Sequence, residues 1–193
     1  MKLLLIFFTL LISVFACAPA PHIAYYTIYL GEHTAQMATK QDTIFIEPFA
    51  VTQEYSQDRL VYQDSPYKVS FDHYRRWIVP PAELLRIRLS EFLKYDCKYS
   101  NVTTHFPKQD QFVTISCAIR LFRERIKPDG RFAQVSVWIE LRESQNRHPV
   151  WAGLLQHEQQ ITKPSAEAIV EAMSLATAAV FKQISERLRL YLE

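Results

Sequence analysis

The feature that most constrains the fold is the turn sequence Pro128-Asp129-Gly130, which separates two segments of alternating apolar and polar residues. Proline presets one turn dihedral, and glycine accepts the positive φ that a tight turn requires. The alternation therefore predicts a β-hairpin with one buried face and one solvated face. Its apolar positions are Val113, Ile115, Cys117, Ile119 and Leu121 before the turn, with Thr114, Ser116 and Arg120 on the other face, and Val135, Val137, Ile139 and Leu141 after the turn.

Two helices and further strands follow from the same kind of pattern. Pro80-Pro81 opens a helix that extends to Tyr95, because proline is tolerated in the first helical turn. Residues 165–192 keep apolar residues at helical spacing for more than five turns, at Ile169, Met173, Ala176, Val180, Ile184 and Leu188. Extended segments are predicted at residues 25–30, 43–49, 59–63, 67–71 and 149–161. Two helices with about seven strands predict an α+β fold, with a mostly antiparallel sheet and both helices packed on one face.

The amino terminus has the pattern of an export signal. Lys2 precedes a short apolar run that ends at Val14-Phe15-Ala16-Cys17. A transmembrane helix needs about 20 apolar residues, and this run is shorter. We predict a signal peptide over residues 1–16, lipidation of Cys17, and an extended tether over residues 17–24, which contains Pro19 and Pro21. An ordinary signal peptide, cut after Ala16 or Ala18, is the alternative.

Lipidation would fix the location of the chain. Acyl chains contribute about 0.8 kcal/mol for each buried methylene, so several of them on one cysteine hold a protein at a bilayer. The residue after Cys17 is Ala18 and not the aspartate that retains enteric lipoproteins in the inner membrane, which favours the outer membrane, with the domain facing the periplasm. The remaining residues, 25–193, are expected to form a single domain.

Cys97 and Cys117 form an even pair in a compartment that permits disulfides. Joining them would stabilise the fold by about 3 kcal/mol in the chain-entropy model. A cysteine on the apolar face of a strand is as often a small core residue with a free thiol. Both alternatives stay open at this point.

Composition excludes several classes of function. The three glycines are far apart in the sequence, so no phosphate-binding loop can be written. The segment after residue 16 has no Lys/Arg-rich run, which argues against a nucleic-acid partner. The six histidines lack metal-ligand spacing, and no nucleophile motif is present. We therefore expect neither an enzyme nor a bound metal or cofactor.

Aromatic and arginine residues are dense between residues 55 and 77. Such residues carry much of the binding energy at protein interfaces, although most buried rings simply belong to a core. The candidate partner surface consists of Tyr55, Arg59, Tyr62, Tyr74, Arg76 and Trp77, within a cluster that also includes Tyr67, Phe71 and Arg75. The alternative is that most of these rings are core, with Trp77 wedged between helix and sheet.

Most of the chain after the tether resembles the ABC-type transport auxiliary lipoproteins, the family that includes the outer-membrane lipoprotein of the paraquat-inducible intermembrane lipid-transport system. The resemblance lies in residues 25–30 (Tyr-Tyr-Thr-Ile-Tyr-Leu), 44–49 (Ile-Phe-Ile-Glu-Pro-Phe), 58–62 (Asp-Arg-Leu-Val-Tyr) and 74–77 (Tyr-Arg-Arg-Trp), and in the long closing helix. It implies a non-enzymatic component that docks an MCE-type periplasmic protein of an ABC transporter to the outer membrane, and it leaves open a homo-oligomer. The alternative function is an envelope assembly or scaffold lipoprotein unrelated to lipid transport.

Overall fold

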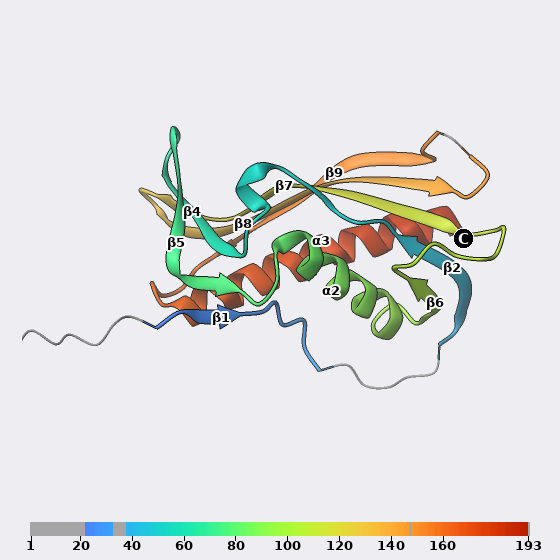
Figure 1. Cartoon of the computed structure of the whole chain (residues 1–193), viewed down its shortest axis with the longest axis horizontal. Helices are drawn as coiled ribbons and strands as arrows, with labels where there is room; N and C mark the ends of the chain where they lie inside the picture. Colours follow the sequence, from blue (N-terminus) through green and yellow to red (C-terminus); the bar gives the residue numbers. More distant parts are fainter. Residues whose placement is uncertain (1–21, 33–37, 147, 193) are drawn as a thin grey trace, which may run out of the picture.

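The computed structural model describes residues 22–32, 38–146 and 148–192. The predicted signal peptide, Cys17 and most of the tether lie outside these described residues. Within them, two helices lie on one side of a curved sheet (Figure 1). The strands are β1 (Ala24–Tyr26), β2 (Lys40–Ile46), β3 (Ala50–Val51), β4 (Arg59–Ser65), β5 (Lys68–Trp77), β6 (Tyr99–Thr103), β7 (Val113–Lys127), β8 (Gly130–Glu143) and β9 (Trp151–Gln160). The helices are α2 (Pro81–Tyr95) and α3 (Ala166–Leu192), with a short 3-10 turn, η2, at Gln53–Tyr55.

The long strand β7 is the frame of the sheet. It pairs along its whole length with β8 in an antiparallel hairpin that closes at the Lys127 and Gly130 pair, and β9 pairs with the other edge of β8. Gly130 has a φ of +146°, a conformation that residues with a Cβ rarely adopt, so glycine is required at this turn. The predicted hairpin and the predicted third strand are both confirmed.

Three short strands cover the second edge of β7 in chain order, all parallel to it. β2 pairs at residues 113–115, β3 at 118–119 and β4 at 124–125. β5 then pairs antiparallel with β4, while β1 is parallel to β5 and β6 is parallel to β2. The predicted α+β class is confirmed, and the sheet is mixed, because the chain passes through α2 before it returns as β7 in the same direction as β2, β3 and β4.

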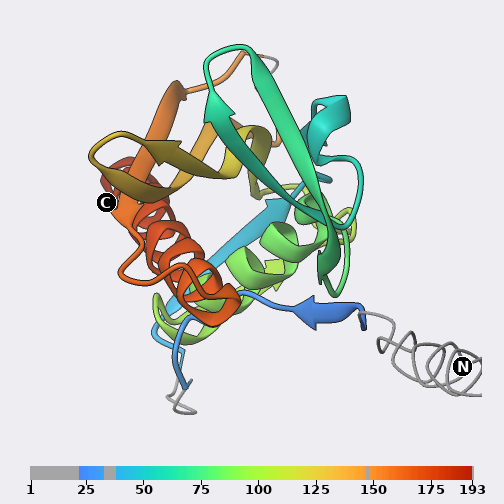
Figure 2. The ribbon, with the colours of Figure 1, turned by 90° about the vertical axis from the view of Figure 1, so that its left-hand side faces the viewer.

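Both helices close the inner face of the sheet. α3 packs against β8 and β9, and α2 packs against β6 and contacts α3. Phe92 and Phe181 join the two helices, with ring centroids 5.9 Å apart. Although α3 is long and apolar enough to cross a membrane, its predicted apolar stripe is buried in the domain core. Figure 2 shows the sheet curving around the helices. The turn of the β4–β5 hairpin lies at the top of this view, and β1, which pairs with the end of β5, lies below it.

A bulge in β7 changes which side chains face the helices. The pairing with β8 shifts between Ile119 and Leu121, so the extra residue, Arg120, is exposed. Before the shift, Ile119 points inward as predicted. After it, Phe122 is the buried side chain, at 1% exposure, and Leu121 is displaced from the inner face assigned to it by simple alternation. The expectation for Leu121 was therefore wrong, since strict alternation does not extend through a bulge.

Candidate functional site

Two residues of the predicted partner surface lie in the core, and the other four are at least partly exposed. Tyr55 is 0% exposed and Trp77 is 1% exposed, so neither can contact a partner. The Trp77 ring packs on Phe122, with centroids 5.1 Å apart, and burial raises the pKa of Tyr55 well above its ordinary value. These two assignments were wrong, and the alternative that they are core rings is confirmed.

The other predicted residues remain at least partly accessible. Arg59 and Arg76 face each other across β4 and β5, and Tyr62 lies farther along β4. Arg76 makes an ion pair with Asp58 at 3.5 Å. All three are half-buried, whereas Tyr74 is 49% exposed. The accessible part of the predicted surface therefore follows the β4–β5 hairpin.

The tip of this hairpin is the most exposed aromatic position in the described chain. Tyr67 is 98% exposed at the two-residue turn between Ser65 and Lys68. The turn is held by Gln63, whose side-chain amide donates a hydrogen bond of 3.2 Å to the Pro66 carbonyl. The tip of the hairpin points away from β1, which pairs with the opposite end of β5 (Figures 1 and 2). A partner can reach the Tyr67 ring without moving any other element.

Asp72 organises a bulge at the base of the hairpin. Its carboxylate accepts hydrogen bonds from the backbone N–H groups of Tyr74 (2.9 Å) and Arg75 (2.7 Å), and from Arg75 Nε (2.6 Å). Burial by itself would raise the pKa of Asp72, but these hydrogen bonds and the Arg75 charge outweigh it, so the pKa is lowered. The bulge holds His73 and Tyr74 on the surface, with ring centroids 6.3 Å apart.

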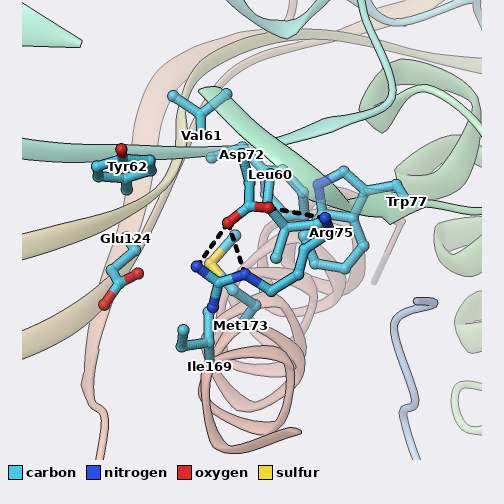
Figure 3. Close-up of a pocket in the computed structure, with 10 residues that line it drawn as sticks. Leu60, Val61, Tyr62, Asp72, Arg75, Trp77, Glu124, Ile169 and Met173 are labelled. Atoms are coloured by element: carbon cyan, nitrogen blue, oxygen red, sulfur yellow. Dashed lines mark hydrogen bonds and ion pairs between the residues drawn. The ribbon is translucent and has the colours of Figure 1, made fainter. Parts of the chain in front are cut away.

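Arg75 connects this bulge to the core (Figure 3). Its side chain extends from β5 over Ile169 and Met173 of α3, while its guanidinium pairs with Asp72 at 2.6 Å. The space beneath it that water could enter has a volume of only about 10 Å³, barely enough for one water molecule. The gap between sheet and helix is thus filled by side chains at this point.

A second ion pair lies beside the bulge. Glu124 of β7 is only 4% exposed and accepts a short hydrogen bond from Arg131 Nε of β8. Because Glu124 is buried, losing Arg131 would leave its charge uncompensated, so this pair stabilises the contact between the two strands. Arg131 keeps about 30% of its side chain exposed.

These groups meet in a shallow pocket of about 200 Å³. It combines aromatic rings with two guanidinium groups that remain partly accessible, although both are ion-paired. We call the following set the hairpin surface: Tyr62, Tyr67, His73, Tyr74, Arg75 and Arg131. The sequence predicted Tyr62 and Tyr74 as surface residues, with Tyr67 and Arg75 in the wider cluster. His73 and Arg131 were not predicted. The signal that could have located His73 is Asp72, because an aspartate that caps the N–H groups two and three residues later is typical of a turn.

Cys97 and Cys117 are free thiols in the structure. Cys117 is buried on the inner face of β7, and burial raises the pKa of its thiol far above the ordinary value. Cys97 follows α2 and is half-buried, and burial also raises its pKa, opposed by a hydrogen bond with Ser185 of α3. The sequence left open either a disulfide between Cys97 and Cys117 or two free thiols, and the structure has the free thiols. Cys17, the predicted lipidation site, lies outside the described residues.

A larger, polar cleft lies at the other end of the molecule, near the end of α3. Its volume is about 680 Å³, and amide and hydroxyl side chains of β2, β6 and the loop before β7 line it. Tyr191 donates a short hydrogen bond to Glu143 there, and burial together with this contact raises the pKa of Tyr191 to about 12. Among the residues that the structure describes, no group of His, Cys, Asp or Glu side chains is arranged to hold a metal ion.

The sequence model of one protein family, described as ABC-type transport auxiliary lipoprotein component, matches residues 26–185. The chain belongs to this family. The match begins at the end of β1 and extends through most of α3, so it includes the hairpin surface. No protein of curated function matches the chain significantly.

Solved structures of several other proteins show the same fold. An uncharacterized protein with 18% identity has a TM-score of 0.72, and the alignment covers 86% of this chain and 99% of that protein. A protein from Xanthomonas campestris with 13% identity has a TM-score of 0.73, covering 86% and 93% of the two chains. A hypothetical protein from Chlamydia trachomatis has 10% identity and a TM-score of 0.53, covering 76% and 95%. At these identities the likeness concerns the fold alone.

Proposed function

We propose that the chain is an outer-membrane lipoprotein, anchored through Cys17, that docks the MCE-type periplasmic component of an ABC-type phospholipid transport system. It acts without catalysis, as an adaptor between that component and the membrane. The membership of the family of transport auxiliary lipoproteins supports the general role. The observation that carries the docking role is the hairpin surface, which presents exposed rings and accessible guanidinium groups on a rigid support.

The composition of the hairpin surface suits a protein partner. Tyrosine and arginine are enriched among the residues that dominate interface energy, because they offer both apolar area and hydrogen bonds. Tyr67 at the tip is free to insert into a partner, and the Asp72 bulge fixes the direction of Tyr74 before binding. Preorganisation of this kind lowers the entropy cost of association.

The interior of the domain supports an adaptor role as well. Trp77, Phe122 and Met173 occupy the space between sheet and α3 where an apolar ligand would otherwise lie. A domain packed in this way offers its outer surface to a partner. Lipid transfer would then take place in the docked periplasmic component.

The test is a detergent pull-down of the tagged full-length chain from its native envelope. We expect recovery of an MCE protein encoded beside it. Replacing Tyr67 and Tyr74 together by serine should abolish recovery, since losing each interface hot spot costs about 2 kcal/mol or more of binding free energy.

Leu190→Ala is the matched control. Leu190 is 63% exposed near the end of α3, away from the hairpin. This variant should recover the MCE protein as the unmodified chain does. Recovery of outer-membrane assembly proteins in place of an MCE protein would favour the scaffold alternative, and full recovery by the double serine variant would exclude the hairpin surface as the docking site.

A further inference from the structure

The first described segment carries a row of exposed apolar side chains directly after the tether. Ile23, Tyr25 and Tyr29 are 45%, 60% and 64% exposed, and Ile78 beside them is 62% exposed. We call these four residues the tether-side patch. Single exposed apolar residues are ordinary on a protein surface, but a contiguous group marks an interaction site.

Strand pairing brings the patch together. Tyr25 lies opposite Arg76 in the parallel pairing of β1 with β5. Ile78 follows two residues later and donates its backbone N–H to the Tyr26 carbonyl at 2.8 Å. Because side chains alternate along a strand, Tyr25 points outward while Tyr26 packs against the core. Ile78 therefore lies beside the outward row of the first segment.

The two helices hold the rest of this segment in place. The backbone N–H of Tyr29 donates to Ser174 Oγ of α3 at 3.1 Å. Arg88 of α2 donates from Nη2 to Thr27 Oγ1 at 2.9 Å. Ile28, between them, is completely buried. The outward direction of the tyrosine rings is thus fixed by the fold.

The patch lies close to the predicted anchor. Six residue steps separate Ile23 from Cys17, and at full extension they span at most about 20 Å. A domain lipidated at Cys17 must therefore keep Ile23 near the bilayer surface. Tyrosine concentrates at the boundary between headgroups and acyl chains, where the ring is apolar and the hydroxyl is hydrated.

We propose that the tether-side patch rests in the headgroup region of the membrane that holds the anchor, so that the domain lies on the bilayer in one orientation. This inference rests on the proposed lipidation of Cys17. The occupant of the patch is a phospholipid surface, and the contact is mainly apolar. The neighbouring arginines are already ion-paired, Arg76 with Asp58 at 3.5 Å and Arg88 with Glu91 at 2.6 Å.

The orientation has a direct geometric result. In both views the tip of the β4–β5 hairpin points away from β1, which pairs with the other end of β5 (Figures 1 and 2). When the tether-side patch faces the bilayer, Tyr67 points away from the membrane. The hairpin surface is then presented to the periplasm.

The test places a photo-crosslinking benzoylphenylalanine at position 25 or 29 of the full-length chain, reconstituted into vesicles of phosphatidylethanolamine and phosphatidylglycerol. Both positions hold exposed tyrosines, so the aromatic replacement should not disturb folding. We expect phospholipid adducts at both positions after irradiation. The matched control carries the crosslinker at position 67, where the exposed tyrosine faces the other way, and it should form no lipid adduct.

Mass spectrometry of Cys17 in the same samples separates this inference from the proposed anchor. Acylated Cys17 without lipid adducts at positions 25 and 29 would overturn the membrane contact and leave the anchor intact. Adducts to a second copy or to another protein at these positions would also overturn it. Lipid adducts with unmodified Cys17 would support the contact and refute the anchor, and the absence of both would refute the two proposals together.

Discussion

Residues 113–192 form three consecutive antiparallel strands and a helix, whereas residues 24–103 supply strands that mostly pair in parallel with strands far along the chain. The later region has nearly all of its pairing between neighbours in sequence. The earlier region uses β7 as a template and adds short strands to its free edge. Both surfaces that we propose for function, the hairpin surface and the tether-side patch, lie mainly on the earlier region. Residues 113–192 thus form the structural support, and residues 24–103 carry most of the two surfaces proposed to bind a partner and the membrane.

Phe122→Ala should have the largest effect, because Phe122 is where the two regions meet. It is 1% exposed on β7 and packs on Trp77 of β5. Replacing a buried phenylalanine by alanine costs about 3 to 5 kcal/mol. We expect a loss of that size in the free energy of unfolding, measured with urea. Hydrogen exchange should accelerate in β4 and β5 as well as in β7, and acceleration confined to β7–β9 would contradict the template role of β7.

Glu124→Ala should have an intermediate effect. The variant leaves Arg131 without its buried partner, but about 30% of the Arg131 side chain is exposed, so water compensates part of the charge. A loss of about 1 to 3 kcal/mol of unfolding free energy is expected. The control is Glu158→Ala, which removes the exposed Lys127–Glu158 ion pair and should cost less than about 1 kcal/mol. Equal losses in the two variants would show that burial of Glu124 is unimportant.

Asp72→Asn should have a smaller and pH-dependent effect. The folded-state pKa of Asp72 is lowered, so its charged form stabilises the fold above the unfolded-state pKa, and this contribution disappears as the pH falls through the folded-state pKa. Near neutral pH we expect a loss of about 1 kcal/mol, since the amide keeps part of the hydrogen bonding. Urea unfolding at a series of acidic pH values should show the two proteins converging. A difference that stays constant down to the acid limit would exclude the carboxylate as the cause.

Tyr67→Ser should leave stability almost unchanged. Its ring is 98% exposed, and surface substitutions of this kind shift the unfolding free energy by no more than about 0.5 kcal/mol. The thermal midpoint should therefore match that of the unmodified chain. A clear drop would mean that Tyr67 supports the hairpin itself, and the loss of partner recovery in the double serine variant would then need another explanation.

The sequence predicts residues 113–192 well because the signals in this region are local. The Pro128-Asp129-Gly130 turn, the alternation around it and the helical stripe from Ile169 to Leu188 are each visible in a short window. All three are present in the structure, except that the alternation is interrupted by the bulge at Arg120. The earlier region is harder to predict. β3 has only two residues, and β6 has the polar sequence Tyr-Ser-Asn-Val-Thr, so their pairing depends on the template strands beside them.

The candidate surface was predictable only in part for a related reason. Composition located the cluster between residues 55 and 77, but it could not separate exposed rings from buried ones. Tyr55 and Trp77 are buried in the core, and Trp77 packs on Phe122 of β7, a long-range contact that no short window reveals. The Asp72 bulge shifts the facing of His73 and Tyr74 relative to regular alternation. A bulge changes the side of the strand on which a side chain lies, and amino-acid composition does not reveal that side.

Strand β5 also defines a mechanical connection. Its last three residues pair with β1, which continues from the tether, and its first residues form one arm of the projecting hairpin. Tension applied between the membrane and a docked partner would therefore pass along a single strand, from one end of β5 to the other. The Asp72 bulge lies in the middle of that path. In the arrangement that we propose, the Asp72–Arg75 contacts would therefore lie on the path between the anchored end and the docked end of the chain.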